Sequence, residues 1–251
     1  MPAAMWKLWL KPGWHYGLDM TNNFSSLRAV FFDFDGVILD TETMLFKSWC
    51  HVAESHGCSF PLKEWAANAG GYQYHLFDPI THIEKEAGIT LNREEVNDER
   101  RAWFFEQAAT LDPLPGIAEA LKAVKSIGLP LAIVSSSNRE WVESNLERLQ
   151  LLSYFDTLCC GNEVEAVKPA PDVYELALER MGVQADQACT LEDSPQGIAA
   201  AVAADIYCIA VPNQVTRAAA LKGYQRRVDN LRDRPFKELL LDIEKDLSRA
   251  L

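Results

Sequence analysis

Short apolar runs alternate with longer amphipathic segments along most of the chain. The apolar runs predict strands at Ala29–Phe34, Leu131–Val134, Thr157–Cys160, Ala188–Leu191 and Tyr207–Ala210. The segments after them have helical periodicity, at Ile117–Ser126, Glu140–Leu149, Asp172–Met181, Gln196–Ala203 and Arg217–Leu221, with a last helix at Pro235–Ala250. Apolar strands that alternate with helices are typical of a parallel sheet covered on both faces. The pattern therefore predicts an α/β fold with a parallel-sheet core.

One interval of the chain breaks this alternation. Between residues 43 and 112 three helical patterns occur, at Thr43–His56, Pro79–Ala87 and Asn92–Ala109, and no strong strand pattern separates them. Seventy residues are too many for a loop. We expect residues 43–112 to form an inserted helical cap on a core made of residues 27–42 and 113–251. Residues 1–26 carry no motif, and we expect them to be an N-terminal extension.

Charge and composition limit the choice of partner. The formal net charge is −12, which argues against nucleic acid or an anionic membrane as a partner, because both need a basic face. No apolar run reaches the length of a membrane span or of a signal-peptide core, so we expect a cytoplasmic protein. The six cysteines form no C-x-x-C pair, which favours reduced core thiols over disulfides or zinc ligands. We expect a monomer or a weak homodimer.

Two aspartates interrupt the apolar run of the first predicted strand. Asp33 and Asp35 lie two positions apart, so in a strand their side chains would project to the same face. Carboxylates at that spacing repel each other unless a cation lies between them or one of them holds a proton. A requirement for stability alone does not account for this pair.

Polar clusters also follow the other predicted strands. Ser135 opens "SSSN", Lys168 lies in "VKPAPD", and Glu192 and Asp193 lie in "LEDSPQG". Each cluster taken alone is compatible with a helix cap or a turn, and Asn138 is a suitable N-cap residue. In parallel sheets, however, ligands bind beyond the carboxyl ends of the strands. The order of the clusters along one sheet edge therefore indicates a binding site.

This ordered set resembles the four motifs of the haloacid dehalogenase superfamily. "DFDGVILDTE", residues 33–42, is similar to the first motif, Ser135 to the second, Lys168 to the third, and Glu192 with Asp193 to the fourth. The intervals from Asp33 to Ser135, Lys168 and Asp193 are 102, 33 and 25 residues in turn. The helical insertion resembles the cap of the β-phosphoglucomutase-like branch. The resemblance, which covers roughly residues 27–211, implies a Rossmann-like core.

The resemblance also implies a reaction. Asp33 would be the nucleophile that forms an aspartyl-phosphate, and Asp35 would be the general acid and base. Lys168 would offset negative charge, and the hydroxyl of Ser135 would hydrogen-bond the phosphoryl group. Ser136, through its backbone N–H, and Asn138 would add contacts to the substrate. The implied cofactor is Mg²⁺, with ligands from the set Asp33, Asp35 (through its carbonyl), Asp193 and Glu192.

Features of the cap favour a hydrolase over a mutase. In the β-phosphoglucomutase family a histidine lies five residues after the aspartate of the "DT" pair. That aspartate corresponds to Asp40 here, and the residue five positions later is Leu45. The expected substrate loop, "NAGGYQYH", contains neither lysine nor arginine. Gly71, Tyr72 and Gln73 in this loop are candidate substrate contacts, and packing at the cap hinge is an equal alternative for Tyr72.

We therefore expect a Mg²⁺-dependent phosphatase that acts on a small phosphorylated metabolite, such as a sugar phosphate. A sugar-phosphate mutase is the first alternative, and a catalytically silent binding module is the second. Steady release of phosphate separates a phosphatase from a mutase. Absence of any phosphoenzyme points to the silent module.

Overall fold

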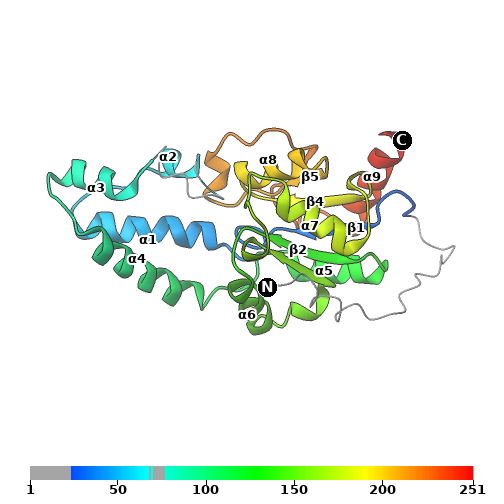
Figure 1. Cartoon of the computed structure of the whole chain (residues 1–251), viewed down its shortest axis with the longest axis horizontal. Coiled ribbons are helices and arrows are strands. Elements are labelled where there is room, and N and C mark those ends of the chain that lie inside the picture. Colours follow the sequence, from blue (N-terminus) through cyan, green and yellow to red (C-terminus); the bar gives the residue numbers. More distant parts are fainter. Residues whose placement is uncertain (1–23, 68, 70–76, 251) are drawn as a thin grey trace.

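The computed structural model describes residues 24–67, 69 and 77–250, and Figure 1 shows their arrangement. The candidate contacts Gly71, Tyr72 and Gln73 lie outside the described residues, as does most of the expected N-terminal extension. Within the described part of the chain, no helix is both long enough and apolar enough to cross a membrane.

A six-stranded sheet with every neighbouring pair parallel forms the centre of the molecule. Its strands, in the spatial order β3-β2-β1-β4-β5-β6, have the bounds β1 Ala29–Phe32, β2 Leu131–Ser135, β3 Thr157–Cys160, β4 Ala188–Glu192, β5 Tyr207–Ala210 and β6 Arg226–Arg227. The central strands β1, β2 and β4 are buried throughout. The predicted α/β fold with a parallel core is confirmed, and β6, which has no apolar signal, is an addition to it.

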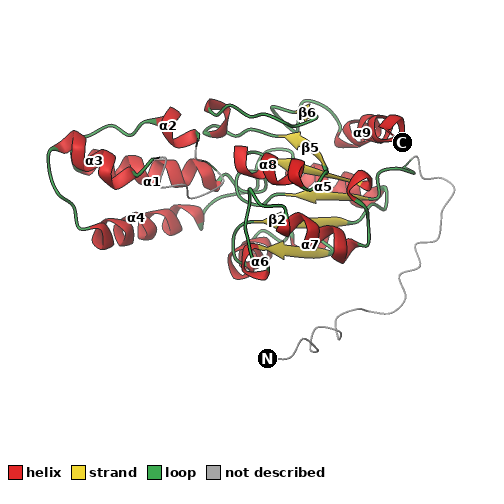
Figure 2. Cartoon of the chain, turned by 45° about the horizontal axis from the view of Figure 1, so that its top comes forward, coloured by secondary structure: helices red, strands yellow, loops and turns green. Residues whose placement is uncertain are grey.

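Helices cover both faces of this sheet (Figure 2). The bounds of the helices are α1 Thr41–Ser55, α2 Leu62–Ala66, α3 Pro79–Ala87, α4 Arg93–Ala108, α5 Ile117–Ser126, α6 Arg139–Arg148, α7 Asp172–Met181, α8 Pro195–Ala203 and α9 Phe236–Ala250. Helices α5, α6 and α9 bury their apolar faces in one core cluster with Val30 and Phe32. Helices α7 and α8 form a second cluster with Phe31. Alternate residues of β1 thus face opposite layers, as the strand period requires.

The first strand is shorter than its apolar run. It ends at Phe32, two residues before the predicted end, because the chain turns there: the N–H of Gly36 bonds to the carbonyl of Leu39 at 2.6 Å, and that of Ile38 to the carbonyl of Phe34 at 2.9 Å. Phe34 is fully buried although it lies outside the ladder. The turn carries Asp33 and Asp35 beyond the sheet edge.

One predicted helix is wrong. The segment at Arg217–Leu221 contains only a single 3₁₀ turn, Thr216–Ala218, after which Ala219 has an extended backbone. Asn213 accounts for the short turn, because its Oδ1 atom accepts hydrogen bonds from the N–H groups of Val215 and Thr216. A side chain that satisfies these two donors stabilises one turn, and nothing continues the helical hydrogen bonds.

Helices α1–α4 follow the first strand in the sequence and precede α5. In space they extend to one side of the sheet (Figure 1). They enclose an apolar cluster of their own, which includes Trp49, Phe60 and Ile83. Trp49 is 1% exposed and belongs to this core. Four of the six cysteines are buried, the other two are partly buried, and all six are free thiols.

Glu244 of α9 fixes the segment that leads into β1. Its two carboxylate oxygens accept backbone N–H bonds from Ser25 at 2.9 Å, from Ser26 at 2.9 Å and from Leu27 at 2.7 Å. Burial alone would raise the pKa of Glu244, but these hydrogen bonds outweigh it and lower the pKa below its usual value. The carboxylate thus takes the place of the backbone carbonyl acceptors that a helix or a strand would provide for these N–H groups.

We expect Glu244→Ala to lower the free energy of unfolding at neutral pH by about 2 kcal/mol, since three backbone donors lose a charged acceptor. In a chain of this size the melting temperature should fall by roughly 4–8 °C. A lowered native pKa stabilises the fold above the ordinary value of 4.5, and this contribution is lost as the pH falls through the native pKa. The difference in melting temperature from the unchanged protein should therefore begin to narrow below about pH 4.5. Glu238→Ala, at a mostly exposed side chain of the same helix, is the control and should change stability by less than about 0.5 kcal/mol.

Candidate active site

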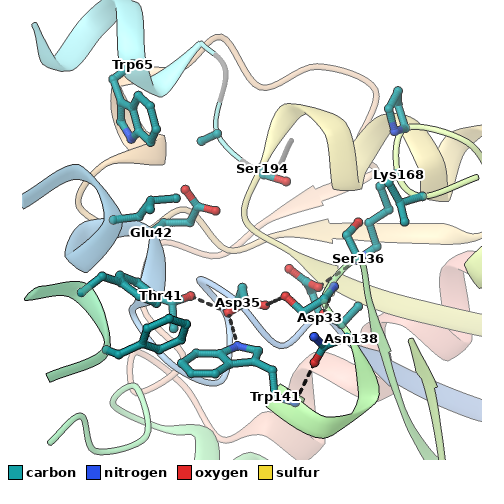
Figure 3. Close-up of a pocket in the computed structure, with 18 of the residues that line it drawn as sticks. Asp33, Asp35, Thr41, Glu42, Trp65, Ser136, Asn138, Trp141, Lys168 and Ser194 are labelled. Carbon is teal, nitrogen blue, oxygen red and sulfur yellow. Dashed lines mark hydrogen bonds and ion pairs between the residues drawn. The ribbon is translucent and has the colours of Figure 1, made fainter. Parts of the chain in front are cut away.

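The carboxyl ends of β1, β2 and β4 open into a cavity of about 600 Å³ that helices α1, α2 and α4 also line (Figure 3). All four residues predicted to be catalytic line it, namely Asp33, Asp35, Ser135 and Lys168. Ser136 and Asn138, predicted to contact substrate, line it as well. The structure thus brings together side chains that lie up to 135 positions apart in the sequence.

Lys168 lies between two carboxylates at the floor of this cavity. Its Nζ atom is 2.8 Å from Oδ1 of Asp33 and 2.6 Å from Oε1 of Glu192, and it also donates to the carbonyl of Val134 at 2.7 Å. The three side chains are at most 10% exposed. Burial acts to lower the pKa of Lys168, but the two carboxylates outweigh it and raise this pKa. Lys168 therefore stays charged throughout the physiological range.

Asp33, Glu192 and Asp193 form a cluster of buried carboxylates. One oxygen from each lies within 4.8 Å of the others. Burial raises the pKa of Asp33 well above its usual value, Lys168 opposes this shift, and Glu192 adds to it. Burial also raises the pKa of Asp193, and the charges of Glu42 and Asp33 raise it further. The ionised form of the cluster is therefore disfavoured unless positive charge beyond that of Lys168 is present.

This cluster has the chemistry of a site for a hard divalent cation. The Oε2 atom of Glu192 and the Oδ1 atom of Asp193 are buried, and neither has a hydrogen-bond partner among the described residues. Buried polar atoms are normally paired, so these two oxygens lack a partner that a cation would supply. The donor set consists of oxygens only, as Mg²⁺ prefers. The residues present fit Mg²⁺, the cofactor that the family resemblance implies.

Asn213 and Gly36 hold Asp193 in position. The Nδ2 atom of Asn213 donates to Oδ2 of Asp193 at 2.6 Å and lies 3.5 Å from the carbonyl of Gly36. Gly36 has φ +86°, and a Cβ atom added there would overlap the carboxylate of Asp193. Only glycine fits at this position. Sequence reasoning missed Asn213, although it follows β5 at the same sheet edge as the predicted site residues.

Asp35 accepts hydrogen bonds from three separate elements (Figure 3). Thr41, the first residue of α1, donates its hydroxyl to Oδ1 at 2.8 Å, and Ser137 donates to Oδ2 at 2.6 Å. The indole Nε1 of Trp141, in the first turn of α6, donates to Oδ1 at 3.1 Å. These contacts fix the orientation of the carboxylate. None of the three donors was predicted from the sequence, and the polar run "SSSN" was the one signal for Ser137.

The loop after β2 presents a row of polar groups to the cavity. Ser135 is buried, and its Oγ atom accepts the N–H of Ser137 at 3.0 Å. Asn138 is the N-cap of α6, where its Oδ1 atom accepts the N–H of Trp141 at 2.8 Å. Asn138 thus serves as the helix cap that the sequence suggested and also lines the cavity.

Tyr174 of α7 supports the floor of the site from below. Its hydroxyl donates to Oε1 of Glu192 and lies 3.0 Å from the hydroxyl of Thr190. The ammonium of Lys168 lies 5.3 Å from the centre of the tyrosine ring, within the range of a cation–π contact. Tyr174 therefore helps to position both members of the Lys168–Glu192 pair, and the sequence alone gave no sign of it.

Comparison with known proteins agrees with this geometry. Residues 30–211 match the family of haloacid dehalogenase-like hydrolases. YhcW of Bacillus subtilis is 34% identical over 219 residues, which cover 86% of this chain and 97% of that protein. The "Phosphorylated carbohydrates phosphatase" of Thermotoga maritima is 35% identical over 182 residues, 72% of this chain and 82% of that protein.

A solved structure confirms the fold. The β-phosphoglucomutase of Clostridium difficile superposes with a TM-score of 0.67 at 22% identity, covering 89% of this chain and 99% of that one. At this identity the likeness shows the shared architecture of sheet and helical cap.

Proposed function

The chain belongs to the haloacid dehalogenase-like hydrolases, and we propose that it is a Mg²⁺-dependent phosphatase that acts on a sugar phosphate or a similar small monoester. The observation that carries the proposal is the buried ion-pair arrangement of Lys168 with Asp33 and Glu192, in the same cavity as a carboxylate, Asp35, that three donors hold in place. The "Phosphorylated carbohydrates phosphatase" supports the substrate class. We place the cap at residues 43–112.

In this proposal the reaction takes two steps. A carboxylate oxygen of Asp33 attacks phosphorus, the bond between phosphorus and the alcohol oxygen breaks, and Asp35 gives its proton to that oxygen. Asp35 then takes a proton from a water molecule whose oxygen attacks the aspartyl-phosphate. Inorganic phosphate leaves and Asp33 is restored. Asp35 is suited to both transfers because it lines the open cavity.

Other side chains stabilise the transferring group. Lys168 offsets charge next to Asp33. Ser135, Ser136 and Asn138 line the same cavity, where the hydroxyl of Ser135, the N–H of Ser136 and the amide of Asn138 would donate hydrogen bonds to the phosphoryl oxygens. Mg²⁺ would be held by Asp33 and Asp193 and by the backbone carbonyl of Asp35. Glu192 would be either a direct ligand or an outer-shell partner. Bound there, it supplies positive charge that reduces the repulsion between carboxylate and phosphate.

The lining of the cavity favours hydrolysis over the mutase reaction. Leu45, at the position of the mutase histidine, lines the cavity and has no polar side-chain atom. Lys168 is the one lysine or arginine among the described lining residues, and it is already paired. A mutase that holds a bisphosphate needs a second cationic site, and these residues do not provide one.

Phosphate release tests the proposal. With Mg²⁺, we expect steady release of inorganic phosphate from one or more members of a panel of sugar monophosphates, and EDTA should reduce the rate at least about 100-fold. Re-addition of Mg²⁺ should restore it. Interconversion of sugar phosphates without phosphate release would support the mutase instead. No turnover and no phosphoenzyme in folded protein would favour the silent binding module.

A further inference from the structure

Three aromatic side chains connect the proposed cap to the core beside the cavity. Phe104 and Phe105 lie in the last turn of α4, and Trp141 lies in the first turn of α6. The ring centre of Trp141 is 5.9 Å from that of Phe104 and 5.7 Å from that of Phe105, and the two phenylalanine rings are 5.4 Å apart. All three line the cavity, and we call them the aromatic bridge.

The aromatic bridge makes a polar contact with the reacting groups through one atom. The indole Nε1 of Trp141 donates to Oδ1 of Asp35 at 3.1 Å, and Figure 3 shows the indole directed at this carboxylate. The other two donors to Asp35, on Thr41 and Ser137, are hydroxyls. A hydroxyl can turn and accept instead of donating, whereas an indole N–H only donates. Trp141 therefore imposes a fixed direction on the carboxylate.

The packing of the ring fixes the position of this N–H in turn. Trp141 is half-buried and packs against both α4 phenylalanines, and its backbone N–H donates to Oδ1 of Asn138 at the start of the helix. A side chain held at both ends has little freedom to rotate, so the N–H stays directed at Asp35 without further ordering. The position of Asp35 thus depends on contacts made by α4 as well as on contacts within the core.

We propose that Trp141 is a positioning residue for the proton transfer by Asp35 to the leaving alcohol, with its ring held by the aromatic bridge. This inference rests on the proposed function. The indole N–H aligns the carboxylate of Asp35 with the oxygen of the leaving group. Loss of the N–H would leave substrate binding and nucleophilic attack in place, and it would impair the delivery of the proton.

Leaving groups of different basicity separate this role from a structural one. A sugar alkoxide needs the proton as the bond to phosphorus breaks, whereas nitrophenolate is stable enough to leave without it. The parameter kcat/KM reports steps up to the release of the alcohol, so it contains the first proton transfer and excludes hydrolysis of the phosphoenzyme. The ratio of kcat/KM for the two substrates does not depend on the fraction of active enzyme.

The test compares Trp141→Phe with the unchanged enzyme on p-nitrophenyl phosphate and on the sugar phosphate that the unchanged enzyme hydrolyses fastest. We expect kcat/KM for the sugar phosphate to fall about tenfold. For p-nitrophenyl phosphate it should change less than about twofold. Benzothienylalanine at position 141, which keeps the shape of the indole and lacks the N–H, should reproduce the result where phenylalanine impairs folding.

Trp103→Phe is the matched control. Trp103 lies on the same helix as the phenylalanines, stacks on His51 at 5.6 Å and is absent from the described lining of the cavity, so the ratio should not change. A ratio that Trp141→Phe leaves unchanged would overturn the inference while the phosphatase stands. If the enzyme without any substitution released phosphate neither from p-nitrophenyl phosphate nor from any sugar phosphate, the proposed function and this inference would both be overturned.

Discussion

Asp33→Asn is expected to lower phosphate release by about 10⁴-fold or more, the largest effect of any single substitution in this chain. The amide is a poor nucleophile and cannot form the acyl phosphate that divides the reaction into two steps. It also removes one negative charge from the carboxylate cluster with Glu192 and Asp193. The fold should survive, because Lys168 keeps its ion pair with Glu192. Initial rates with the best sugar phosphate and Mg²⁺ measure the effect.

Asp40→Asn is the matched control for that substitution. Asp40 belongs to the same sequence motif but serves as the N-cap of α1, where its side chain accepts the N–H of Thr43. Asparagine caps a helix as well as aspartate does, so activity should stay within about twofold. Equal losses in the two variants would show that the motif acts on the fold and not through a nucleophile at Asp33.

Lys168→Met is expected to affect both catalysis and stability. It leaves the buried carboxylates of Asp33 and Glu192 without their cation, and losing one partner of a buried pair costs about 3–5 kcal/mol. The melting temperature should fall by roughly 10 °C when measured without added metal, since a cation would offset the same carboxylates. Activity should fall by about 10²–10³-fold, the usual loss when one group that stabilises the transition state is removed.

Lys125→Met is the control that shows whether the effects of Lys168→Met would follow from replacing any lysine by methionine. Lys125 pairs with Asp156 at 3.4 Å, and both side chains are about one-third exposed. Surface pairs of this kind contribute less than about 1 kcal/mol, so stability and activity should change little. If Lys168→Met kept its melting temperature and lost only activity, the buried pair would not support the fold as described.

The sheet was predictable because its strands carry a strong and local signal. A parallel strand that is covered on both faces, such as β4, is mostly apolar, so the run at Ala188–Leu191 could be recognised from the local sequence. The strand β6 has no such signal, since it consists of Arg226 and Arg227 at the sheet edge. The helix predicted at Arg217–Leu221 is absent because Asn213, outside that segment, binds the N–H groups of the preceding turn.

The sheet topology was enough to predict that the site residues lie together. It was not enough to predict the residues that hold them in position. Parallel strands place their carboxyl ends along one edge, so Asp33, Ser135 and Lys168 were expected to meet. Trp141 reaches Asp35 across 106 positions, and this contact depends on the direction of α6 and on the packing of α4. Tyr174 likewise reaches Glu192 only because α7 packs beneath the sheet. No periodic pattern or motif in a single sequence predicts such contacts.

The formation of a covalent phosphoenzyme on Asp33 tests the central claim most directly. The enzyme with Mg²⁺ is mixed with its best sugar phosphate, quenched in acid within the first turnovers, digested and examined by fragmentation mass spectrometry. The account predicts one phosphoryl group on the side chain of Asp33, none in Asp33→Asn, and none when EDTA replaces Mg²⁺. Phosphate release at full rate with no label on Asp33, or with the label on another side chain, would contradict it.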